Sequence, residues 1–198
     1  MGYPEAPWRM HADLWLSLFR VPGSGDRLAG VYGAAWVSYR EPSPLTYHEL
    51  LVARMRRDRP GRPLTVTDIW VDSVESRDGG RALWAIPKEL CDFEVERRHT
   101  GPLRRASWEA FDEAGTIATA RFSDLSALGP RVPFRGATLQ PALEPGADGE
   151  VTAPLRGSAR SVPARAAWSF EPRGPLGWLA GCRRLGSFRL TDVRMAFG

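Results

Sequence analysis

Position 88 carries the single lysine of this chain, since the other members of its 27 basic residues are all arginine. Arginine serves wherever a solvated positive charge is needed, but it neither loses its proton in a protein nor condenses with a carbonyl. A lysine kept in such an arginine-rich background indicates a position that needs an amine. The alternative is a surface lysine that survived by chance.

The residues around Lys88 are apolar. Trp84-Ala-Ile-Pro87 precedes the lysine, and Leu90 follows closely. If the side chain points inward, this setting disfavours the ammonium form and lowers the pKa of the amine. A neutral amine can attack a substrate carbonyl and form a Schiff base. We therefore predict that Lys88 is a buried nucleophile with a lowered pKa.

The segment that contains Lys88 resembles the Schiff-base segment of acetoacetate decarboxylases, in which a Gly-Arg pair precedes a Pro-Lys pair. Here these pairs are Gly80-Arg81 and Pro87-Lys88. Upstream, Tyr47-His-Glu49 resembles the family's Tyr-x-Glu, and Pro7-Trp-Arg-Met-His11 resembles its opening strand. The resemblance covers roughly residues 5–125 and suggests a short, divergent member of the acetoacetate decarboxylase-like superfamily.

This resemblance implies a fold and an assembly. The expected fold is mostly β, of the α+β class, with an antiparallel β-barrel or cone that is closed or nearly closed around an apolar cavity. A few short helices accompany it. The resemblance also implies a homo-oligomer, and it implies neither a metal nor an organic cofactor.

The resemblance further implies roles for particular residues. Lys88 is the nucleophile and electron sink, and Glu49 moves protons during dehydration and enamine protonation. For Glu49, a position on the solvent face of a strand is the alternative. Arg81 either holds a substrate carboxylate or forms a structural ion pair. The expected pocket residues are Tyr47, Trp70, Trp84 and Ile86.

Three positions depart from the decarboxylase pattern and leave the reaction open. Glu89 stands where the decarboxylases carry a second lysine, Asp13 where they carry an arginine, and Gly33 where they carry a further cavity glutamate. If Glu89 met Lys88, its charge would hold the amine protonated. We expect a carbon–carbon lyase acting on a small keto acid, either a β-keto acid decarboxylase or a pyruvate-type aldolase and dehydratase.

Two other classes of protein remain as alternatives. A non-catalytic, small-molecule-binding β-barrel would keep the apolar cavity but would need no titratable amine. A nucleic-acid-binding protein is disfavoured, because the net charge is only +4 and the basic residues are spread along the chain. We therefore expect no nucleic-acid partner.

Strand-like segments recur along the chain with turn residues between them. The predicted strands are Leu14 to Val21, Val31 to Tyr39, Tyr47 to Arg54, Leu64 to Val71, Phe93 to Arg98, Arg105 to Phe111, Thr116 to Phe122 and Ser187 to Phe197. The first should be central, because both of its faces are largely apolar. Because strand neighbours alternate between faces, His48 should point away from the cavity that Glu49 enters.

Helix signals are weak, and the predicted helical turns are Trp178 to Leu185 and the residues just after Pro87. Pro141 to Pro154 is poor in large apolar residues and is expected to form an exposed excursion. We expect one domain over residues 1–198, because the length suits a single hydrophobic core.

The cysteines, the histidines and the apolar segments indicate where in the cell the protein is expected. Cys91 and Cys182 are far apart and suggest neither a zinc site nor a disulfide framework. The three histidines are too scattered for a metal set. No segment is long and apolar enough for a membrane span, and the first residues do not resemble a signal peptide. We expect a cytoplasmic protein without a membrane partner.

Overall fold

The computed structural model describes residues 2–125, 129–143 and 149–198, and within them it is mostly β. The strands are β1 (Trp8–Val21), β2 (Gly30–Arg40), β3 (His48–Met55), β4 (Leu64–Val71), β5 (Lys88–Leu90), β6 (Asp92–Thr100), β7 (Leu103–Asp112), β8 (Gly115–Asp124), β9 (Arg131–Pro141), β10 (Glu150–Phe170) and β11 (Arg183–Phe197). The helical elements are α1 (Val74–Trp84) and the short 3-10 turn η2 (Gly177–Leu179). The prediction of a mostly β fold is confirmed.

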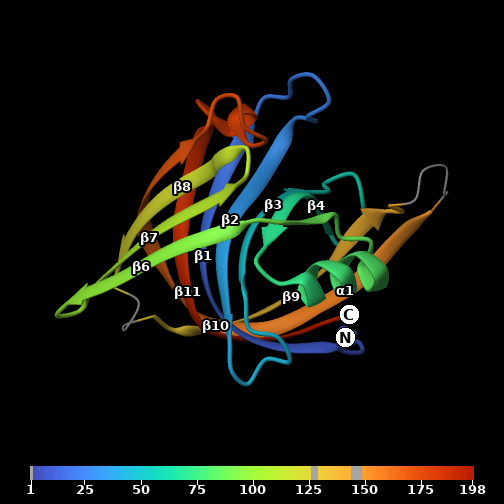
Figure 1. Ribbon diagram of the computed structural model, residues 1–198, viewed down its shortest axis with the longest axis horizontal. Coiled ribbons are helices and arrows are strands. Elements are labelled where there is room, and N and C mark those ends of the chain that lie inside the picture. The colour runs from blue at the N-terminus through green and yellow to red at the C-terminus, as the bar shows by residue number, and fades with distance from the viewer. Residues whose placement is uncertain (1, 126–128, 144–148) are drawn as a thin grey trace.

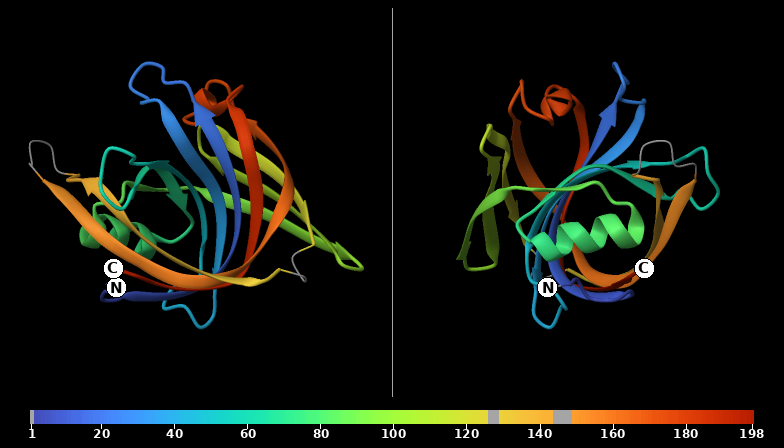
Figure 2. Two further views of the ribbon diagram at one scale, coloured as in Figure 1. Left: turned by 180° about the vertical axis from the view of Figure 1, so that it is seen from behind. Right: turned by 45° about the vertical axis from the view of Figure 1, so that its right-hand side comes forward.

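Seven strands form a ring in the order β11-β1-β2-β3-β4-β9-β10, and β10 pairs with β11 to complete it. All but one of these pairings are antiparallel ladders, while β4 meets β9 through one parallel pair, Leu64 with Thr138. The ring is therefore nearly closed and is weakest at β4 and β9. Helix α1 lies within the curve of this ring (Figures 1 and 2).

Strand β10 is long enough to take part in two regions of the sheet. Its first part pairs with β9 and β11, and residues 164–170 pair with β8. Strands β8, β7 and β6 follow as an antiparallel arm that leans away from the ring (Figure 1). The arm covers the tryptophan-rich face of β1 and β2.

Two hydrophobic cores lie on opposite sides of this sheet. The core beneath the arm is built on stacked indoles, with Trp36 between Trp108 and Trp168 at centroid distances of 5.5 and 5.6 Å. The second core surrounds α1 and contains Trp8 and Trp84. Because large aromatic side chains bury the most apolar area, these two clusters hold the sheet's two faces in place. The candidate site residues Tyr47, Trp84 and Ile86 belong to the second cluster.

Each of the eight predicted strands is present, and β1 is central between β11 and β2 as expected. Strands β9 and β10 were missed because their sequences are rich in Ala, Gly and Pro, which have low strand propensity. These strands form through pairing with distant partners. The predicted excursion over residues 141–154 was too long, since β10 begins at Glu150. Residues 144–148 of it lie outside the described residues.

The two helix predictions had different outcomes. The turn predicted over Trp178 to Leu185 was met in its first residues, which lie in η2, but β11 already begins at Arg183. The residues after Pro87 form β5, so the second prediction was wrong. Helix α1 was missed because Gly79 and Gly80 interrupt its sequence, and glycine disfavours a helix interior. Tertiary packing around those glycines stabilises the helix instead.

None of the helices in the described ranges is long and apolar enough to cross a membrane. The same ranges contain no group of three or more His, Cys, Asp or Glu side chains arranged to hold a metal ion.

Candidate active site

The amine of Lys88 lies in the core that surrounds α1, with 4% of the residue exposed. Its Nζ donates hydrogen bonds to Glu49 Oε2 at 2.9 Å, to Ser76 Oγ at 2.9 Å and to Tyr47 Oη at 3.3 Å. Glu49 is equally buried, at 3% exposed. The structure thus brings together Lys88, Glu49 and Tyr47 from the sequence analysis, and it adds Ser76.

Strand β3 positions Glu49 through the alternation of its side chains. Glu49 points inward, while His48 points to the other face and pairs through Nδ1 with Asp72 Oδ2 at 2.8 Å. This orientation of His48 confirms the sequence-based expectation. A second buried phenol completes the carboxylate's surroundings, since Tyr39 on β2 donates from Oη to Glu49 Oε1 at 3.2 Å. Each oxygen of Glu49 therefore accepts one hydrogen bond.

Helix α1 brings Ser76 to the amine from its first turn. Ser73 caps the helix, its Oγ accepting a hydrogen bond from the backbone N–H of Ser76 at 3.1 Å. The hydroxyl of Ser76 is consequently not needed for capping and bonds to Lys88. Sequence reasoning missed Ser76 and Tyr39, because neither belongs to a motif whose spacing relates it to Lys88, and it is the fold that brings them to the buried group.

The spacing from Gly80 to Lys88 follows from how the chain reverses after α1. Ala85 adopts a left-handed conformation with φ of 53°, and the N–H of Ile86 bonds to the carbonyl of Gly80 at 3.1 Å. The chain then returns along the helix, and Lys88 lies against Gly80. A Cβ at position 80 would lie 2.8 Å from Cδ and Cε of Lys88. A residue larger than glycine would have to displace the lysine side chain from that space.

The electrostatics of the buried group differ from the expectation. Burial alone lowers the pKa of Lys88, but the charge of Glu49 and the contacts with Tyr47 outweigh it, so the pKa lies above its ordinary value. The predicted lowered pKa was wrong, because the sequence showed the apolar neighbours and not the carboxylate partner. Burial has the opposite effect on a phenol, whose charged form is the deprotonated one, and it raises the pKa of Tyr47 to about 12. This phenol is therefore neutral at physiological pH.

Arg81 and Glu89 lie outside this buried group. Arg81 Nη1 donates to the carbonyl of Lys88 and to Glu89 Oε1, both at 3.0 Å. Glu89 is exposed, and its carboxylate is turned away from the lysine amine. Of the two alternatives for Arg81, the structure contains the ion pair. The amine is thereby separated from the acidic residue that follows it in the chain.

The remaining predicted residues are divided between the two cores. Ile86 and Trp84 belong to the core of Lys88, and the Trp84 ring packs edge-on against Trp8 and Phe197 at centroid distances of 4.8 and 4.6 Å. Trp70 belongs to the other core, beneath the arm. The structure therefore places Trp84 and Ile86, but not Trp70, in the apolar surroundings of the amine.

Comparisons with known proteins agree on the fold. No family model matches the chain, and neither does any curated protein. Among solved structures, an acetoacetate decarboxylase-like enzyme from Sphingomonas wittichii RW1 superposes with a TM-score of 0.66 at 15% identity, covering 98% of this chain and 92% of that one.

Two further structures resemble the chain over its whole length. Acetoacetate decarboxylase from Legionella pneumophila gives a TM-score of 0.63 at 11% identity, covering 100% of this chain and 86% of that one. The enduracididine biosynthesis enzyme MppR in complex with pyruvate gives 0.64 at 14% identity, with coverages of 100% and 89%. The chain therefore has the acetoacetate decarboxylase-like fold that the sequence resemblance implied.

Proposed function

We propose that the protein is a carbon–carbon lyase that forms a Schiff base between Lys88 and a small keto acid. The observation that carries the proposal is the buried ion pair of Lys88 and Glu49, in which the single lysine of the chain contacts a proton-accepting carboxylate at 2.9 Å. Burying an ion pair costs free energy that an apolar pair would avoid. A reaction that needs both groups gives a reason for this arrangement.

The pair can begin the reaction by transferring a proton. Glu49 accepts one proton from the ammonium of Lys88, which leaves a neutral amine beside a neutral carboxylic acid. As the amine nitrogen bonds to the carbonyl carbon, the π electrons move to the oxygen, and a proton passes from nitrogen to that oxygen. Glu49 then protonates the hydroxyl group, which leaves as water, and the iminium forms.

The iminium accepts the electrons of a bond that breaks next to it. In a β-keto acid the bond to the carboxylate breaks, carbon dioxide leaves, and the electron pair forms an enamine. A proton then adds to the enamine carbon, and hydrolysis releases the ketone and the amine. Tyr47 and Ser76, which contact Nζ in the resting protein, would hold the nitrogen in place through these steps.

Aldol condensation and dehydration with pyruvate is the second candidate reaction. It shares every step up to the iminium. The methyl carbon of the pyruvate iminium then gives up a proton to the Glu49 carboxylate, and the resulting enamine attacks the carbonyl carbon of an aldehyde. One observation favours it: the enduracididine biosynthesis enzyme MppR, which has the same fold, was solved in complex with pyruvate. Arg81 is engaged with Glu89, so in either reaction other groups would have to bind the carboxylate of the substrate.

Borohydride trapping tests the proposal. The protein is incubated with acetoacetate, pyruvate and other keto acids, reduced, and weighed intact by mass spectrometry. Because Lys88 is the single lysine, the N-terminal amine is the remaining site for an adduct, and peptide mapping separates the two. We expect a keto-acid-dependent adduct on Lys88, with carbon dioxide release or aldol products distinguishing the two reactions.

Two variants serve as controls. Lys88→Arg keeps a positive charge beside Glu49 but cannot condense with a carbonyl, so it should fold and give no adduct. Glu89→Gln changes an exposed carboxylate that does not contact the amine, so it should be trapped like the wild type. Absence of an adduct across the panel, in a folded protein, would contradict the proposal and favour a binding protein.

A further inference from the structure

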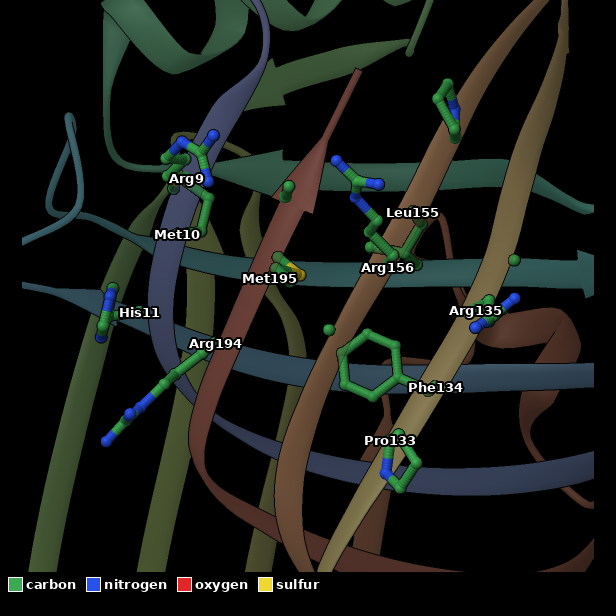
Figure 3. A pocket seen from close by; sticks show the side chains of 14 residues that line it. Arg9, Met10, His11, Pro133, Phe134, Arg135, Leu155, Arg156, Arg194 and Met195 are labelled. Carbon is green, nitrogen blue, oxygen red and sulfur yellow. The ribbon is translucent and has the colours of Figure 1, made fainter.

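An arginine-lined groove of about 750 Å³ lies on the ring at a distance from the amine, and its lining includes none of the residues that contact Lys88 Nζ. It is formed by the first residues of β1 and by the facing segments of β9, β10 and β11 (Figure 3). The proposed lyase chemistry does not use these residues.

The register of the four strands places three arginines in one row. Arg9 pairs with Ala196, Ala196 pairs with Arg156, and Arg156 pairs with Arg135. Directly paired residues share a face of the sheet, so the three guanidinium groups belong to the same side, and all three residues are exposed. Figure 3 shows Arg9 and Arg156 on either side of the end of β11.

The small side chain of Ala196 keeps the middle of the row open. It lies between Arg9 and Arg156, where a larger residue would fill the space between their stems. The neighbouring row points to the other face, where Met10 is buried in the core around α1. The floor of the groove is therefore backed by packed apolar residues, and its open side carries the positive charges.

Among the described residues, no acidic side chain pairs with these charges. Arg135 and Arg156 are directly opposite each other, an arrangement that is destabilising for like charges. In the described part of the chain, neither they nor Arg9 form an ion pair or a side-chain hydrogen bond. The nearest acidic group along β11, Asp192, is already shared by Arg40, Arg131 and Arg194.

We propose that this groove binds a small anion with several phosphate groups. Guanidinium groups bind phosphate through two parallel hydrogen bonds, which suits Arg better than Lys. The row spans three strand spacings, or about 14 Å, and flexible arginine side chains can converge on one ligand within that span. A single phosphate could engage one or two of them, whereas a linear oligophosphate presents charge to all three.

Titration calorimetry with inorganic tripolyphosphate tests this proposal, with orthophosphate and citrate compared at the same ionic strength. We expect saturable binding of one tripolyphosphate per chain, tighter than that of either comparator. Arg156→Gln should weaken it by about tenfold or more, since a lost charge-assisted contact has at least that effect. Arg156→Lys keeps the positive charge but loses the paired donors of the guanidinium group. Its affinity for tripolyphosphate should lie between those of the wild type and Arg156→Gln.

Arg121→Gln is the matched control, because Arg121 is also exposed and lies on β8, outside the groove. It should bind like the wild type. Absence of saturable binding would overturn the proposal, as would equal weakening by Arg121→Gln or binding of many anions per chain. If Arg156→Gln fails to fold, Arg135→Gln is the substitute. These readouts do not depend on lyase activity, so this proposal and the proposed function fail separately.

Discussion

Nζ of Lys88 and Oε2 of Glu49 lie 2.9 Å apart in a core that almost completely excludes solvent. The two groups come from β5 and β3, 39 residues apart in the chain. Their contact sets the resting protonation state of the candidate nucleophile. It also means that the properties of either group depend on the other, which leads to the first prediction.

Glu49→Gln should change both the stability of the protein and the pH at which the amine reacts. Without the carboxylate, burial is no longer outweighed by the charge of Glu49, and the pKa of Lys88 should fall. The trapping rate should then reach half its maximum at a lower pH than in the wild type. Removal of one partner from a buried pair also costs about 3–5 kcal/mol of folding free energy. Trapping rates across pH and urea denaturation measure the two effects. An unchanged pH profile would contradict the assignment of Glu49 as the group that raises the pKa of Lys88.

Stability should fall at alkaline pH. The pKa of Lys88 in the folded protein lies above its ordinary value of 10.5, and those of Tyr39 and Tyr47 lie above 10.0. For groups with raised folded pKa values, the stabilising contribution is complete below the ordinary values and is lost as pH rises through the folded ones. Urea denaturation at increasing pH should show the free energy of unfolding declining from about pH 10 upward. Tyr47→Phe should make this decline with pH less steep, because one of the buried titrating groups is removed. A decline as steep as in the wild type would contradict the raised pKa of Tyr47.

Alanine substitutions at the adjacent glycines Gly79 and Gly80 of α1 should differ in their effects on trapping rate and stability. Gly80→Ala places a Cβ 2.8 Å from Cδ and Cε of Lys88, so it should displace the amine. A displacement of about 1 Å can slow a reaction on the order of 100-fold, while the added helix propensity offsets part of the strain. Trapping rates and thermal melting measure both quantities.

Gly79→Ala is the comparison variant for Gly80→Ala. Its Cβ would lie 2.7 Å from the ring of Trp8, in the packed core and not at the amine. It should lower the melting temperature, while the protein that remains folded should be trapped at a rate close to that of the wild type. Equal effects of the two variants on trapping would indicate that Gly80 acts through general packing.

Ser76→Ala should affect the amine without disrupting the helix. The cap of α1 is supplied by Ser73, so loss of the Ser76 hydroxyl leaves it intact. The ammonium loses one of its three buried acceptors, a cost of about 1.5–3 kcal/mol for a hydrogen bond to a charged group. The pKa of Lys88 should fall, which moves the trapping profile to lower pH. Ser73→Ala, in contrast, should lower helix stability and leave that profile unchanged.

Several features of this protein were determined by the sequence alone. The single lysine in an arginine-rich chain identified the candidate nucleophile. Strand-like segments between turn residues located eight strands, and side-chain alternation placed His48 on the face opposite Glu49. The Gly-Arg and Pro-Lys pairs identified the segment that surrounds the amine. These are local properties, since residue chemistry and side-chain alternation need no information about distant partners.

The tertiary structure decided what depends on contacts between distant segments. It placed Ser76 and Tyr39 in the buried group, turned Arg81 outward to Glu89, and assigned Trp70 to the other core. It also reversed the expected direction of the Lys88 pKa, because the nearby charge of Glu49 and the Tyr47 contacts together outweigh burial. Strands β9 and β10 and helix α1 exist for the same reason, since their weak local propensities are overcome by pairing and packing against segments far along the chain.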